Sequence, residues 1–119
     1  MKTAKELFDE LNSWDENRRI EAKSASAVGK SMMETVCAFA NEPGLRGGYL
    51  LLGAKRTGMT EDGKPVYEPE NIENTDKIQS DFVAMCNSMF NVCIRPIINV
   101  EEYLGKTVIV VKIEELPES

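Results

Sequence analysis

The stretch GGYLLLGA, residues 47–54, decides how the rest of the chain folds. From Tyr49 to Ala54 it is almost continuously apolar. A strand with one face in water alternates apolar and polar side chains, whereas a continuous apolar run is typical of a strand covered on both faces. We therefore predict a central strand at residues 49–54, in a sheet with helices packed on it.

The segment before this strand predicts a second strand followed by a helix. RRIEAK, residues 18–23, alternates in the manner of a half-buried strand, so that Glu21 and Lys23 share one face. A helix is then expected from residues 26–29 to Asn41, with a broad apolar stripe facing the sheet. The asparagine, proline and glycines of NEPGLRGG end that helix.

Two further helices are predicted from their capping signals. Residues 3–13 form a short amphipathic helix, in which Thr3 is the N-cap and Glu6 completes a capping box. Asp76 and Gln79 have the same spacing and predict the start of a helix of about four turns, whose apolar residues recur at helical intervals.

The remaining segments predict turns and strands. The polar run 55–71 contains Asp62-Gly63, a hairpin-turn dipeptide, and a candidate edge strand at residues 64–67. Near the end, residues 97–103 and 107–113 are rich in β-branched side chains and flank a tight connection. These last two segments predict a β-hairpin.

The predicted order is α–β–α–β–(β)–α–β–β, which defines an α+β fold class with helices packed on a mixed β-sheet. At 119 residues the chain is expected to be a single domain, residues 1–119. Its end at EELPES, directly after the last strand, favours the N-terminal part of a longer protein with additional domains.

Composition excludes several kinds of site. The chain has no histidine and no C-x-x-C motif, which excludes a zinc centre and any Ser–His or Cys–His catalytic pair. No apolar run approaches the length that crosses a bilayer, so no membrane contact is expected. The cysteines are odd in number and lie in apolar stretches. We therefore expect them to be buried, reduced thiols in a cytoplasmic protein. They are Cys37, Cys86 and Cys93.

The stretch SASAVGKS, residues 24–31, resembles the end of a phosphate-binding P-loop, but Ser24 replaces the first glycine. A side chain at that position obstructs the tight turn of the loop. The preceding strand also has too few apolar residues for the buried parallel strand that aims a P-loop. We therefore interpret the serines as helix caps and Gly29 as a close-packing position, so that no nucleotide cofactor is expected.

A family resemblance accounts for the same residues. The segment 16–58 resembles the opening of the Schlafen-type AlbA-like domain, and with Pro96 and the strand GKTVIVVKI the resemblance extends over about residues 16–114. The matching motifs are E-x-K on a strand (Glu21, Lys23), A-F-A-N at a helix end (38–41), the pair Gly47-Gly48, and an apolar strand ending at Gly53.

The resemblance implies a nucleic-acid-binding module of a transcriptional regulator or a helicase-related protein. It also implies an alternative, a metal-dependent endoribonuclease in which Glu16 and Glu21 belong to a set of three carboxylates that holds Mg²⁺ or Mn²⁺. The third acid of that set belongs just after Gly53, where this chain has Lys55 and Arg56. The metal site is therefore expected to be incomplete, which favours a protein without catalytic activity.

Charge leaves a third alternative open. The net charge is −6, so contact with DNA or RNA has to come from clustered cations, because phosphate neutralisation dominates such binding. The acidic balance otherwise favours a structural or protein-interaction domain, including a homo-oligomer. The cations expected to contact nucleic acid are Arg18, Arg19, Lys23, Lys30, Arg46, Lys55 and Arg56.

Overall fold

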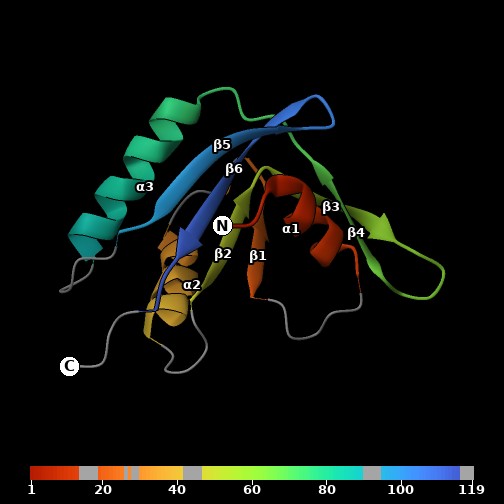
Figure 1. Ribbon diagram of the computed structural model, residues 1–119, viewed down its shortest axis with the longest axis horizontal. Coiled ribbons are helices and arrows are strands. Elements are labelled where there is room, and N and C mark those ends of the chain that lie inside the picture. Colours follow the sequence, from red (N-terminus) through yellow and green to blue (C-terminus); the bar gives the residue numbers. More distant parts are fainter. Residues whose placement is uncertain (14–18, 26, 28–29, 42–46, 90–94, 116–119) are drawn as a thin grey trace.

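The computed structural model describes residues 1–13, 19–25, 27, 30–41, 47–89 and 95–115 (Figure 1). Over these residues the chain order is α-β-α-β-β-β-α-β-β, which confirms the predicted sequence of elements and the α+β class. The elements are α1 (Ala4–Leu11), β1 (Ile20–Lys23), α2 (Lys30–Asn41), β2 (Gly48–Leu52), β3 (Ala54–Met59), β4 (Pro65–Pro69), α3 (Thr75–Met89), β5 (Ile97–Tyr103) and β6 (Lys106–Ile113).

The main sheet has four strands in the order β1-β2-β6-β5. β2 pairs in parallel with β1 and antiparallel with β6, so it lies inside the sheet. Its residues Leu50, Leu51 and Leu52 are at most 1% exposed. The prediction of a central strand covered on both faces is therefore confirmed, but the strand ends at Leu52 rather than at residue 54, because Gly53 turns the chain at φ 91° and Ala54 begins β3 of the other sheet.

Helices cover the two faces of this sheet. α2 and α3 pack on one face, where Met32, Val36 and Phe82 join Leu50 in one buried cluster. α1 packs on the other face, where its apolar side chains meet alternate residues of β2 and β6. That second cluster comprises Ala4, Leu7, Phe8, Leu11, Leu51, Ala54, Val108 and Val110. Figure 1 shows α1 in front of the sheet, with α3 along its β5 side.

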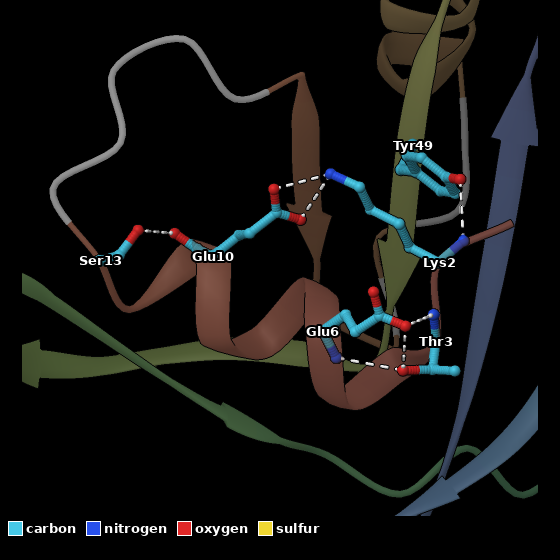
Figure 2. Close-up of polar contacts among 6 residues, drawn as sticks. All are labelled: Lys2, Thr3, Glu6, Glu10, Ser13 and Tyr49. Carbon is cyan, nitrogen blue, oxygen red and sulfur yellow. Dashed lines mark hydrogen bonds and ion pairs between the residues drawn. The ribbon is translucent and has the colours of Figure 1, made fainter.

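The predicted capping box fixes the start of α1 (Figure 2). Thr3 Oγ1 accepts a hydrogen bond from the Glu6 backbone N–H, and the Glu6 carboxylate accepts one from the Thr3 N–H. Glu101 of β5 also accepts a hydrogen bond from the Ala4 N–H at 3.0 Å. The helix N-terminus is thus satisfied by its own cap and by a carboxylate of the sheet, which is the charge that a helix N-terminus favours.

The polar run after β2 is more ordered than its composition predicts. β3 and β4 pair antiparallel as a separate two-stranded sheet, of which the sequence indicated only residues 64–67 and the turn. The predicted turn is present, with Gly63 at φ 85° and the Thr60 N–H donating to the Lys64 carbonyl at 2.8 Å. Figure 1 shows this hairpin extending away from the four-stranded sheet.

The last helix and hairpin follow the prediction with one shift. α3 begins at Thr75, so Asp76 lies in its first turn rather than at the N-cap. β5 and β6 form the expected hairpin, with Leu104 at φ 50° and Gly105 at φ 78° between them. Two consecutive residues with positive φ are the signature of a type I′ turn, whose twist matches that of the paired strands. The predicted hairpin is confirmed.

Candidate functional site

The connection from β1 through α2 to β2 determines where polar groups gather. β1 and β2 are parallel neighbours, so their carboxyl ends lie at the same edge of the sheet. The helix between them runs back along the sheet and begins, at Lys30, on the side of that edge (Figure 1). In open α/β sheets the crevice outside the carboxyl ends of parallel strands is the usual ligand site, and β1 and β2 are the parallel pair of this mixed sheet.

A backbone hydrogen bond joins this edge to the protruding hairpin. The Gly53 N–H donates to the Lys23 carbonyl at 2.8 Å, and β3 begins at the next residue, Ala54. Lys23, at the end of β1, therefore lies beside the chain segment that leads into Lys55. We call the region formed by Lys23, Gly53 and Lys55 the carboxyl edge.

Glu21 and Lys23 form the same-face pair that the strand alternation predicts. Lys23 Nζ lies 3.4 Å from Glu21 Oε1, with the two side chains 23% and 43% exposed. Ile20 and Ala22 pack against the cluster under α1, so the charged pair faces the side of the sheet that carries α2 and α3. A half-exposed ion pair contributes little to stability, and its lysine is available to an anionic ligand at small cost.

Lys55 and Arg56, adjacent in sequence, lie on opposite faces of the β3–β4 hairpin because side chains alternate along a strand. Ala54 packs into the cluster under α1, so Lys55 points away from α1, toward the same side of the molecule as Lys23. Its cross-strand neighbour is Glu68. Arg56 is opposite Tyr67, which packs against the α1 cluster, and so faces the other way.

Arg19 lies at the amino end of β1, away from the carboxyl edge. Its Nε donates to the Gly47 carbonyl at 2.7 Å, and its guanidinium stands 4.8 Å from the centroid of the Phe39 ring. These contacts tie β1 to the end of α2 and to the start of β2. The structure therefore does not bring Arg19 together with Lys23, although only three residues lie between them in the sequence.

Several of the predicted site residues lie outside the described residues. These are Glu16, Arg18 and Arg46, together with the side chain of Lys30. Of the seven predicted cations, Lys23 and Lys55 share the carboxyl edge, Arg56 is on the opposite face of the same hairpin, and Arg19 is elsewhere.

Glu70 is a residue of this region that the sequence analysis missed. Its backbone N–H donates to the Gly53 carbonyl at 2.7 Å, and its Oε1 accepts a hydrogen bond from the Ala25 N–H at 2.7 Å. Glu70 thereby fastens the loop after β1 to the end of the β3–β4 hairpin. Beside it lies a shallow hollow, to which Ala25, Ile72 and Lys77 contribute. A glutamate in a turn-rich acidic segment carries no local signal of such a contact.

The described residues of the carboxyl edge show neither the buried strand of a P-loop site nor a grouped set of three carboxylates, while Glu16 lies outside the described residues. β1 does run parallel to β2, but it is the edge strand and all four of its residues are only half-buried. Within the part of the chain that the structure describes, no three His, Cys, Asp or Glu side chains are grouped to hold a metal ion. Glu21 is placed beside a lysine instead of a second carboxylate.

The cysteines that the structure describes are packing residues. Cys86 is 1% exposed, and burial raises the pKa of its thiol, which keeps the thiol protonated and unreactive. Cys37 is half-buried, and its Sγ accepts a hydrogen bond from Asn41 Nδ2 at 3.1 Å. For Cys86 the prediction of a small buried hydrophobe is confirmed, while Cys93 lies outside the described residues.

This fold, with its β1–α2–β2 crossover and E-x-K strand, is that of a known class of small α+β domains. Residues 16–119 match the model of the Schlafen AlbA_2 family, and the chain belongs to this family. The resemblance drawn from the sequence motifs is therefore confirmed. None of the described helices is long and apolar enough to cross a membrane.

A solved structure agrees with this assignment. The chain is similar to the solution NMR structure of the N-terminal domain of a DNA helicase RecG-related protein from Nitrosomonas europaea. The two share 52% sequence identity with a TM-score of 0.86, over 97% of this chain and 74% of that one. A comparison with curated proteins finds no match.

Proposed function

We propose that this chain is a nucleic-acid-binding module that contacts DNA or RNA phosphates at its carboxyl edge. The observation that carries the proposal is the hydrogen bond from Gly53 to Lys23, which brings the end of β1 to the start of the hairpin that bears Lys55. The similarity to a domain of a DNA-helicase-related protein supports nucleic acid as the anionic ligand.

The proposed interface has few cations, and their number determines the expected affinity for nucleic acid and its dependence on salt. Lys23 and Lys55 point to one side of the molecule, with Glu21 and Glu68 beside them. Lys30, a third predicted cation, is the first residue of α2. Each neutralised phosphate contributes about −0.9 to the slope of log affinity against log salt for duplex DNA. Two or three phosphate contacts therefore predict a slope of about −2 to −3 and weak binding at physiological salt.

Fluorescence anisotropy with labelled duplex DNA, single-stranded DNA and structured RNA over a salt series tests the proposal. Lys23→Gln and Lys55→Gln should each weaken binding and reduce the magnitude of the salt slope by about 1. Lys5→Gln is the matched control, because Lys5 is 73% exposed on α1, on the other face of the sheet. Absence of binding at low salt, or an equal effect of Lys5→Gln, would overturn the proposal.

Arg19→Lys separates a binding role from a structural one. The substitution keeps the charge but loses the planar group that contacts Gly47 and Phe39. We expect it to lower the free energy of unfolding while leaving the affinity for nucleic acid unchanged. A loss of affinity at unchanged stability would assign Arg19 to the interface.

The resemblance to the family also supports a proposal for the finer role of the module. We propose that the module serves a cytoplasmic transcriptional regulator, needs no cofactor and precedes further domains in a longer protein. This role predicts a preference for particular duplex sequences. Selection of binding sites from a random duplex library tests it, and enrichment of no motif would limit the module to nonspecific contact.

The alternative activity, a metal-dependent endoribonuclease, has one supporting observation. Glu21 is 43% exposed on an edge strand and is therefore accessible to an RNA phosphate and a metal ion. Incubation of the protein with structured RNA and Mg²⁺ or Mn²⁺ tests for cleavage. If Glu16 and Glu21 hold the metal ion, Glu21→Gln should abolish this cleavage. Cleavage that persists in Glu21→Gln would exclude Glu21 as a metal ligand. If the protein neither cleaves RNA nor binds DNA or RNA, the result would favour a protein-interaction domain.

A further inference from the structure

Among the residues that the structure describes, β5 is an edge strand of the four-stranded sheet. In the strand order β1-β2-β6-β5 its described partner is β6, through an unbroken register from Ile97 to Tyr103. An edge strand presents unpaired N–H and C=O groups that another strand can bind, and many proteins protect such edges with proline, lysine or a bulge. β5, with the sequence IINVEEY, has no proline, no lysine and no bulge in its pairing with β6, and its two charged residues, Glu101 and Glu102, are adjacent in its second half.

Apolar side chains border this open edge. Val100 on β5 is 43% exposed on the face that carries α3, where Val83 is 39% exposed, and Ile97 is 41% exposed on the opposite face of the strand. Between α3 and β5 lies a shallow hollow lined by neutral side chains: Gln79, Ser80, Val83, Ala84, Asn87 and Ile98. An uncharged, partly apolar surface beside an open strand edge is a surface that a second strand and helix can cover.

The charge pattern of β5 fits a second copy of the same strand. When Ile97–Tyr103 pairs antiparallel with itself over its full length, Val100 lies opposite Val100 on the two-fold axis. In that register Glu101 lies opposite Asn99 and Glu102 lies opposite Ile98, so that no carboxylate faces another. A parallel arrangement would instead bring the acidic ends of the two strands together, which like-charge repulsion disfavours.

We propose that a second copy of this chain docks on β5 in this antiparallel register, with a two-fold axis at Val100. The two four-stranded sheets then join into one continuous sheet. Because the axis is perpendicular to the sheet, the α3 helices of both copies lie on the same side, and Val83 adds to the apolar contact. The carboxyl edge, on β1 at the far side of each sheet, stays open in the dimer.

Sedimentation equilibrium over a concentration series tests the docking. We expect a monomer–dimer equilibrium in which Val100→Lys raises the dissociation constant of the dimer about tenfold or more, because two lysines then face each other on the axis. Met59→Lys is the control, since Met59 is 59% exposed on the separate β3–β4 hairpin. A chain that is monomeric at all concentrations, or a dimer that Val100→Lys leaves unchanged, overturns the proposal.

A cross-linking variant gives a second readout that does not depend on weakening the fold. Directly opposite residues of an antiparallel pair have Cβ atoms about 4.5–5.5 Å apart, so mild oxidation of Val100→Cys should give a covalent dimer. The unsubstituted chain and Met59→Cys set the background from the native cysteines and from random collision. Cross-linking of Val100→Cys at the rate of Met59→Cys would contradict the two-fold axis at Val100.

Discussion

Gly47 shows how a single residue sets the approach of two strands. It has φ 76°, and a Cβ built on it would lie 1.9 Å from the backbone oxygen of Ile113 at the end of β6. Its own carbonyl accepts the hydrogen bond from Arg19. A residue with no side chain is therefore required where β1, β2 and β6 come together, because the neighbouring atoms are backbone and cannot turn aside.

Gly47→Ala is expected to lower the free energy of unfolding by about 2 kcal/mol or more, from the strained φ and the steric clash together. Gly58→Ala is the matched control: nothing lies within 4 Å of a Cβ at that position. Its effect should stay within about 0.5 kcal/mol. Urea denaturation of both variants measures the difference, and equal stabilities would show that β6 can move away from Gly47.

At the scale of elements, α1 is held by contacts at its start that Figure 2 displays. The Lys2 backbone N–H donates to Tyr49 Oη at 2.9 Å, which fastens the chain before α1 to β2. The Lys2 side chain reaches along the helix to Glu10, with Nζ 2.7 Å from Oε1 and 2.9 Å from Oε2. The amphipathic pattern predicts the helix, and these contacts determine how its first turn meets the sheet.

The ion pair at α1 predicts a pH dependence at alkaline pH. The hydrogen bond to Glu10 raises the pKa of Lys2 above its usual 10.5. A raised pKa in the folded state means that the pair stabilises the protein fully below pH 10.5 and that this contribution is lost as the pH rises through the folded-state value.

Thermal unfolding of the native chain and of Lys2→Gln from neutral pH to above the lysine pKa checks this prediction. The native chain should be the more stable at neutral pH by a small margin, because the pair is largely exposed, and the difference should vanish at the alkaline end. Glu10→Gln and the double variant complete a mutant cycle. A margin that does not change with pH would show that packing of the lysine stem, rather than its charge, accounts for the effect.

At the scale of the whole molecule, one sheet joins two buried clusters. Leu50 and Leu52 belong to the cluster under α2 and α3, while Leu51 between them belongs to the cluster under α1. Residues 16–119 match the family, so α1 lies before the matched region, yet it supplies four side chains that are at most 1% exposed. The face that α1 covers would otherwise expose a row of apolar side chains.

Because the two clusters share β2 and β6, we expect damage on one face to weaken the other. Phe8 is fully buried on α1 and stacks on Tyr103, with ring centroids 4.7 Å apart. Phe8→Ala should lower the free energy of unfolding by about 3–5 kcal/mol. That loss should also appear as faster amide exchange in α3, on the opposite face, since one cooperative unit opens as a whole.

Val83→Ala is the control for this prediction, because Val83 is 39% exposed on α3 itself. Its effect on stability should be within about 0.5 kcal/mol. If α3 keeps its amide protection in Phe8→Ala, the two faces unfold independently and the sheet does not couple them.

Local patterns determined most of the fold. The continuous apolar run identified β2, the capping box identified α1, and the β-branched segments identified the β5–β6 hairpin, because each depends on neighbours within a few residues. The E-x-K and A-F-A-N motifs identified the family. The alternation of RRIEAK also predicted correctly that Glu21 and Lys23 share a face.

Only the tertiary structure decided which polar groups meet. Glu70 binds the Ala25 N–H across 45 residues of sequence, and Arg19 turns to Gly47 and Phe39 instead of joining Lys23. Such contacts depend on the path of the chain between strands, and neither helix periodicity nor strand alternation carries that information. The sequence by itself thus determined the elements and the family, whereas the arrangement of charge at the carboxyl edge required the packed sheet.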